Sequence, residues 1–152
     1  METGVMSGPD LHWEEYLEEQ FSLPCHQWDQ YSPLTLAYIG DSVYDLIIRT
    51  VLVKRANTQT AKLHARASGL VKAGAQARIM ETLREHLNPQ EEAIYRRGRN
   101  SKPGHTAKNA DRREYLEATG FEALMGYLYL KKDYRRMIDL VKLGLEECGY
   151  GL

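Results

Sequence analysis

The chain has 152 residues, the length of one domain rather than two. Apolar residues make up 43% of the sequence and charged residues 27%, which is ordinary for a globular domain and excludes a disordered, collagen-like or coiled-coil chain. No stretch approaches the roughly 20 consecutive apolar residues of a membrane span, and no secretion signal is recognisable. Cys25 and Cys148 have no metal-ligand spacing, so we expect a cytoplasmic protein without a disulfide, a zinc site or a membrane partner.

Charge is divided unevenly along the chain. The formal net charge is −1, but the first 30 residues contain seven acids and no Lys or Arg, which leaves +6 on the remainder. Within that remainder, residues 96–113 contain seven basic residues and a single acid. Such a segment either binds a polyanion or forms a solvated basic loop. The charge of the segment alone does not distinguish these two interpretations.

Helical patterns follow one another along the chain, and no segment alternates convincingly between apolar and polar residues as a strand would. The acidic segment 10–21 predicts a short amphipathic helix in an N-terminal extension, residues 1–30, that packs on the core. Ser32 and Pro33, a cap residue followed by proline at the first helical position, predict the start of a long helix over 33–55. Because this helix is apolar on most sides, we expect it to be central and buried.

Five further helices are predicted, each bounded by a cap residue, a glycine or a proline. Asn57 and Thr58 are expected to cap the first of them, and Gly74 to separate it from the second. Residues 99–109 show no helical period and are expected to form a basic loop. The chain is therefore predicted to be all-α, with one main domain over 31–148. The expected helices span 58–71, 75–86, 89–98, 111–130 and 134–148.

Two carboxylates lie in strongly apolar stretches of sequence. Asp41 lies within the helix predicted over 33–55, and Glu122 within the one predicted over 111–130. Burying an ionised side chain there costs on the order of several kcal/mol unless a partner compensates it. A Mg²⁺ ion would compensate both acids, because it takes oxygen ligands and retains several waters. Alternatively, each acid pairs with an arginine or caps a neighbouring helix, and the residues alone leave this open.

Gly40 and Gly126 suggest how the two acids could meet. Glycine within a helix costs about 1 kcal/mol relative to alanine, and such glycines usually permit two helices to approach closely. If the two helices cross at these glycines, Asp41 and Glu122 are brought together.

The segments around both acids resemble a known family. LAYIGDSVYDL, residues 36–46, resembles the ribonuclease III signature, in which an apolar helix carries Gly-Asp. FEALMGYLYL, residues 121–130, resembles the second catalytic helix of that family. Together with the basic stretch RRGRNSKPGHTAKN, residues 96–109, they resemble the Mini-III branch, compact ribonucleases III that lack the double-stranded RNA-binding domain. The resemblance covers residues 33 to about 147.

The resemblance implies an all-α ribonuclease III-like endonuclease domain that hydrolyses double-stranded RNA. It implies that Asp41 and Glu122 are the catalytic residues and the ligands of Mg²⁺, which Mn²⁺ could replace. It also implies a homodimer with one active site per subunit, acting in maturation of the 23S ribosomal RNA precursor. Ala37, Thr119 and Thr60 stand where longer members of the family have further acids, so the resemblance leaves the number of metal ions open.

Roles are also expected for other polar residues. Asp45 is expected to form an ordinary ion pair with Arg49, and His64 to pack or face RNA rather than bind metal. The basic segment is expected to bind the duplex, because double-stranded RNA is recognised mostly by shape and phosphate charge. The residues expected to bind RNA are Arg96, Arg97, Arg99, Asn100, Lys102, Thr106, Lys108 and Asn109.

Two other classes of function compete with this one. A non-catalytic RNA-binding protein on the same fold would have no need of Asp41 and Glu122. An all-helical phosphohydrolase acting on nucleotides would more often show His/Asp pairs, which this sequence lacks.

Overall fold

The computed structural model describes residues 12–24, 27–101 and 112–152. Contacts divide the chain into two compact units, residues 1–30 and 31–152. The first unit contains α1 (Trp13–Gln20), an acidic helix, and a 3-10 turn, η2 (Trp28–Gln30). The described residues contain helices and no strand, which confirms the all-α prediction. None of these helices is long and apolar enough to cross a membrane.

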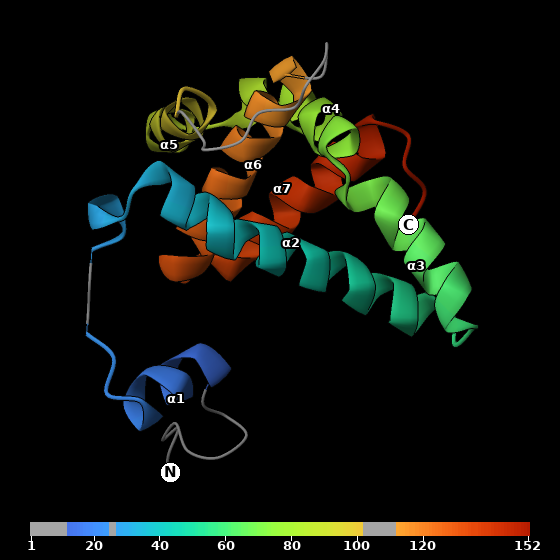
Figure 1. The fold of residues 1–152 in the computed structure, drawn as a ribbon, viewed down its shortest axis with the longest axis horizontal. Coiled ribbons are helices and arrows are strands. Elements are labelled where there is room, and N and C mark those ends of the chain that lie inside the picture. The colour runs from blue at the N-terminus through green and yellow to red at the C-terminus, as the bar shows by residue number, and fades with distance from the viewer. Residues whose placement is uncertain (1–11, 25–26, 102–111) are drawn as a thin grey trace. The chain divides into compact units, whose positions relative to one another are not determined.

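The second unit is built around α6, which runs through its middle (Figure 1). Every residue of α6 from Glu117 to Tyr129 is buried except Glu122. Four helices pack directly on α6, and a fifth, α3, packs on α2 and α4. α6 spans Arg112–Leu130, and the others are α2 (Pro33–Arg55), α3 (Thr60–Val71), α4 (Ala73–Leu83), α5 (Pro89–Arg99) and α7 (Tyr134–Glu147).

The long helix α2 begins as predicted but is not buried all round. Ser32 Oγ accepts a hydrogen bond from the main-chain N–H of Thr35 at 3.1 Å, and Pro33 occupies the first turn. One side of α2 lies against the core, whereas the other side is exposed in the described part of the chain. The expectation of a fully buried helix is therefore wrong, because the neighbouring helices cover only some of the apolar side chains of α2. The exposed apolar residues of α2 are Leu34, Tyr38, Leu46 and Val53.

Helix boundaries after α2 differ from prediction in α3 and α4. The third helix begins at Thr60 after Gln59, so Asn57 and Thr58 do not cap it. Lys72, in extended conformation, separates α3 from α4, and Gly74 lies within the first turn of α4 rather than at the break. α4 ends at Leu83 and is followed by a 3-10 turn, η3 (Arg84–His86). The predicted ranges of α5, α6 and α7 are correct to within one residue.

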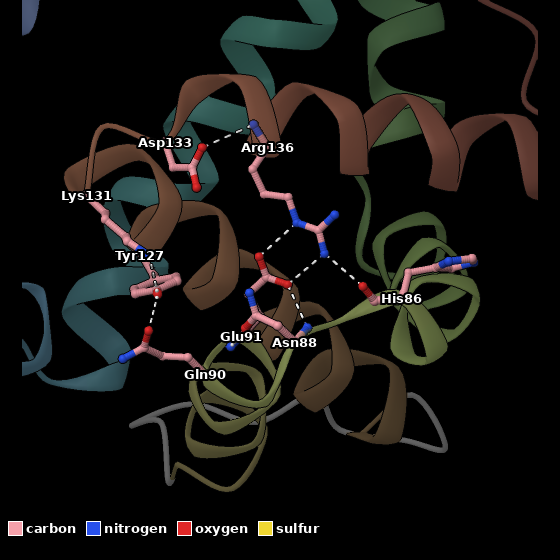
Figure 2. A network of polar contacts seen from close by, with 8 residues as sticks. All are labelled: His86, Asn88, Gln90, Glu91, Tyr127, Lys131, Asp133 and Arg136. Carbon is pink, nitrogen blue, oxygen red and sulfur yellow. Dashed lines mark hydrogen bonds and ion pairs between the residues drawn. The ribbon is translucent and has the colours of Figure 1, made fainter.

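A partly buried ion pair ties α5 to α7 (Figure 2). Glu91, 2% exposed, accepts hydrogen bonds from Arg136 Nε at 2.9 Å and Nη2 at 2.8 Å. Burial alone would raise the pKa of Glu91, but the hydrogen bonds from Arg136 and from the main chain of Asn88 lower it below its usual value. Glu91 also completes a capping box with Asn88. The pair, which sequence analysis missed, fixes the N-terminal end of the helix that carries Arg96, Arg97 and Arg99.

α2 and α6 cross where Gly40 meets Gly126. A Cβ atom at Gly40 would overlap the main-chain carbonyl oxygen of Glu122 and lie 2.7 Å from the main-chain nitrogen of Gly126. A Cβ atom at Gly126 would overlap the carbonyl oxygen of Leu36. Neither position has room for a side chain, which confirms that the two glycines permit the close approach of the helices.

We expect Gly126→Ala to lower the free energy of unfolding by roughly 3 kcal/mol or more, because the added methyl group would force α2 away from α6. The matched control is Gly69→Ala in α3, where an added Cβ meets nothing within 4 Å. That change should stabilise the protein by about 0.4–1 kcal/mol through the unfolded chain. Urea unfolding followed by circular dichroism measures both, and equal stability of the two variants would contradict the close crossing.

Candidate active site

Asp41 and Glu122 lie together at the crossing of α2 and α6. Asp41 follows Gly40, and Glu122 supplies the carbonyl oxygen against which Gly40 packs. The two carboxyl groups are close enough to share a hydrogen bond. The juxtaposition expected from the two glycines is therefore confirmed.

The two acids differ in exposure. Glu122 is half-buried, whereas Asp41 is exposed. The expectation that both are buried is therefore wrong for Asp41, because the side of α2 that carries it is not covered by the described residues of the unit 31–152. The pair is consequently open to an ion or a substrate from the Asp41 side.

The close approach of the acids changes the proton affinity of Glu122. Burial, then the hydrogen bond and negative charge of Asp41, raise the pKa of Glu122 to about 8, and a contact with Gln76 opposes the shift. At neutral pH the pair therefore favours one carboxylate and one carboxylic acid. A divalent cation would compensate both negative charges, since it attracts each carboxylate more strongly than they repel one another.

The donor atoms at this place suit a hard divalent cation. Carboxylate oxygens are the ligands that Mg²⁺ prefers, and one or two of them with several waters suffice. Gln76, 1% exposed, adds an amide beside Glu122 whose Oε1 has no hydrogen-bond partner in the described structure. No group of three His, Cys, Asp or Glu side chains gathers within the described ranges. The residues at the site thus fit a cation held by two acids, water and, at most, neutral oxygens.

The described part of the basic segment lies at the C-terminal end of α5. Arg96 is exposed and hydrogen-bonds Glu92 at 2.6 Å. Arg97 and Asn100 are exposed as well, and the side chain of Arg97 has no recorded partner among the described residues. Of the other residues expected to bind RNA, Lys102, Thr106, Lys108 and Asn109 lie outside the described residues.

Arg99 has a different environment from its neighbours. Its guanidinium lies over the ring of Tyr95, 5.8 Å from the centroid, and 3.8 Å from Oε2 of Glu117. Glu117 is buried and accepts hydrogen bonds of 2.8 and 2.9 Å from the hydroxyl of Tyr95. Burial and Glu117 raise the pKa of Tyr95 to about 12. Arg99 therefore anchors α5 to α6 in addition to any contact with RNA.

Sequence analysis missed Glu117 as a buried acid. It lies on the buried face of α6, which its helical spacing indicates, but its partner Tyr95 is 22 residues away and nothing local marks it. By contrast, Asp45 and Arg49 form the predicted exposed ion pair at 3.1 Å. His64 is exposed on α3.

Comparisons with known proteins agree with this fold. Residues 34–133 match the family described as Ribonuclease III domain, a range that includes both acids. The Mini-ribonuclease 3 of Clostridium tetani is 41% identical over 129 residues, which are 84% of each chain. That of Enterococcus faecalis is 42% identical over 124 residues, 80% of this chain and 94% of the relative. A crystal structure of a Fusobacterium nucleatum protein, 26% identical, superposes with a TM-score of 0.70 over 77% of this chain and 90% of that one.

The fold and the matched range define an endoribonuclease of the ribonuclease III type. Within that family, the chain belongs to the Mini-ribonuclease 3 branch, whose members it matches over most of its length. The family acts on double-stranded RNA and generally depends on a divalent metal.

Ala37, Thr119 and Thr60, the positions where longer members of the family have further acids, have different environments here. Ala37 is buried. Thr119 is buried too, and its hydroxyl donates to the carbonyl oxygen of Tyr115 at 2.9 Å. Thr60 is exposed at the start of α3. Because Ala37 and Thr119 carry no carboxyl group, Asp41 and Glu122 are the two acids that we assign to this crossing.

The raised pKa of Glu122 predicts a pH-dependent stability in the absence of divalent cations. The folded chain binds the Glu122 proton more tightly than the unfolded chain, so this stabilisation is present below about pH 4.5 and is lost as the pH rises to about 8. We expect the contribution to be on the order of 2 kcal/mol, allowing for partial exposure.

Urea unfolding at several pH values in the presence of a chelator measures this dependence. Glu122→Gln should remove it, whereas Asp45→Asn, on the exposed ion pair, should leave it in place. A Glu122→Gln variant with the parent's pH profile would contradict the assignment.

Proposed function

We propose that this chain is a Mg²⁺-dependent endoribonuclease whose catalytic and metal-binding residues are Asp41 and Glu122. The observation that carries the proposal is their contact at the crossing of α2 and α6, within the matched ribonuclease III domain. Two acids held this close are costly without a cation, and the pair is open on the Asp41 side. Mn²⁺ is proposed as a substitute for Mg²⁺, since both take oxygen ligands.

The proposed chemistry is hydrolysis of a phosphodiester bond. When bound, Mg²⁺ polarises a phosphate and makes water more acidic, which supplies the nucleophile without a histidine base. Glu122 is held in place by the core helix α6, and Asp41 extends from α2 into solvent. The two carboxylates therefore fix where a phosphate is bound relative to the protein surface. Their attachment to two packed helices keeps that position rigid.

Duplex binding is proposed for the basic segment, whose described members at the end of α5 are Arg96, Arg97, Arg99 and Asn100. Arg97 is exposed and forms no ion pair with an acid of the described ranges, so its charge is available to a phosphate. Arg96 shares its charge with Glu92, and Arg99 shares its charge with Glu117. Among these three arginines, Arg97 should contribute most to the electrostatic part of binding.

A homodimer is proposed through the exposed apolar side of α2. Tyr38 is 81% exposed and Leu46 57% exposed, and they lie on either side of Asp41 along the helix. Burying these apolar side chains against a second copy would remove apolar surface from water and leave each Asp41 at the edge of the interface. Each subunit would then cut one strand of the duplex.

The proposed substrate is the 23S ribosomal RNA precursor, processed in the cytoplasm. We propose residues 31–148 as the catalytic domain and residues 1–30 as an acidic extension with a short helix. Incubating the purified protein with duplex RNA that carries the precursor's paired stem, with and without Mg²⁺, tests this proposal. Cleavage only with Mg²⁺ supports it. Duplex binding without cleavage would instead identify a non-catalytic RNA-binding protein.

We expect Asp41→Asn and Glu122→Gln each to reduce cleavage of duplex RNA by at least about 1,000-fold, because each removes one of two charged metal ligands. Folding and duplex binding should remain close to those of the parent, since neither change alters side-chain volume much. Asp45→Asn, one turn further along α2, is the matched control and should retain activity. Near-parent turnover of either site variant in Mg²⁺ would overturn the site assignment.

Replacing Arg97 by Ala should weaken duplex binding at low salt and reduce the slope of log affinity against log salt by somewhat under one unit, on the order of 0.7–0.9. Arg96→Ala is the matched control, because Glu92 already neutralises much of its charge, and should change the slope less. Fluorescence anisotropy with labelled duplex RNA over a range of salt measures both. An unchanged slope for Arg97→Ala would mean that the end of α5 is only solvated surface.

Sedimentation velocity tests the proposed dimer. We expect a dimer at micromolar concentration, and Tyr38→Glu should shift it towards monomer because a charge would be placed in the apolar interface. Ile138→Glu, on an exposed residue of α7, is the matched control and should leave the dimer intact. A fully active monomeric parent would contradict the proposal.

A further inference from the structure

Gln76 is a polar residue in the core whose role neither the fold nor the proposed chemistry explains. It lies in the first turn of α4 and is 1% exposed. Its Nε2 donates a hydrogen bond to the carbonyl oxygen of Val71 at 3.0 Å. Because a carbonyl oxygen accepts and does not donate, this bond fixes which end of the amide is nitrogen and which is oxygen.

The same side chain reaches Glu122, one of the two active-site acids. The amide nitrogen also donates to the carboxyl group of Glu122. The hydrogen-bonding capacity of the nitrogen is therefore used. The other end of the amide, Oε1, is buried and has no hydrogen-bond partner within the described structure. An unsatisfied buried acceptor costs about 1–3 kcal/mol, so such an atom calls for an explanation. An unpaired amide oxygen on a side chain that contacts Glu122 can act as a ligand for a cation or accept a hydrogen bond from water bound to that cation.

We propose that Gln76 is a third oxygen donor of the divalent-cation site, with Oε1 presented to the cation or to a water bound to it. The inference rests on the proposed function of Asp41 and Glu122 as cation ligands. It identifies a donor on α4, so three separate helices meet at the site. Gln76 is thus a positioning residue for the cation and for Glu122, whose carboxyl group its amide nitrogen holds.

The composition of the site favours a neutral donor there. Neither Ala37 nor Thr119 supplies a carboxylate, because Ala37 has no side-chain oxygen and Thr119 has only a buried hydroxyl that donates its hydrogen within α6. A third acid would add to the repulsion between Asp41 and Glu122 in the absence of a cation. An amide oxygen completes the oxygen-rich environment that Mg²⁺ prefers without that repulsion.

Binding of Mn²⁺ to the full chain without RNA tests the inference, measured by electron paramagnetic resonance of free Mn²⁺. Gln76→Met, which keeps the side-chain length but removes the oxygen, should weaken binding by about 10- to 100-fold. Gln76→Glu, which keeps an oxygen and adds charge, should bind Mn²⁺ at least as tightly as the parent. Thr82→Val is the matched control on α4, because its hydroxyl serves the carbonyl oxygen of Ile79 and should not affect the cation.

The rise in melting temperature on adding Mn²⁺ is the second readout, and it also shows that each variant is folded. A parent that binds Mn²⁺ no better than Asp41→Asn would overturn the cation site itself and the inference with it. A parent that loses binding in Asp41→Asn but keeps it in Gln76→Met would overturn the role of Gln76 alone. If Gln76→Met fails to fold, Gln76→Glu decides, and weaker Mn²⁺ binding than in the parent overturns the inference.

Discussion

The contact between Gly40 and Gly126 is the constraint on which the rest of the structure depends. It brings the main chains of α2 and α6 together at a distance that no side chain would permit. Asp41 follows one glycine and Glu122 lies one helical turn before the other, so the same contact brings the two carboxyl groups together. One crossing therefore determines both the packing of the two helices and the pairing of the two carboxyl groups. The loss of helix stability caused by two glycines is offset by the close packing that they allow.

The surroundings of the crossing give its two acids different properties. Glu122 belongs to the core helix α6, and burial with the nearby Asp41 raises its pKa to about 8. Asp41 belongs to the uncovered side of α2, where a phosphate could approach. Away from the site, the Glu91–Arg136 pair and the Tyr95–Glu117–Arg99 cluster hold α5 on its neighbours, so the basic end of that helix is presented from a fixed support.

Local patterns were sufficient to predict much of this arrangement. Ser32 and Pro33 mark the start of α2, and the glycines indicate the crossing, because each signal lies within a few residues of its effect. The exposure of Asp41 could not be predicted, since it depends on which side of α2 other elements cover. Gln76 and Glu117 were missed for a related reason: their partners come from different helices, and no spacing along the chain relates them.

The most direct test of the account is a crystal structure of the full chain grown with Mn²⁺, with anomalous scattering used to locate the metal. The account predicts an anomalous peak within coordination distance of the carboxylates of both Asp41 and Glu122, on the exposed side of the α2–α6 crossing. Ordered Mn²⁺ bound elsewhere, with the two carboxyl groups still sharing a hydrogen bond and no peak beside them, would contradict it.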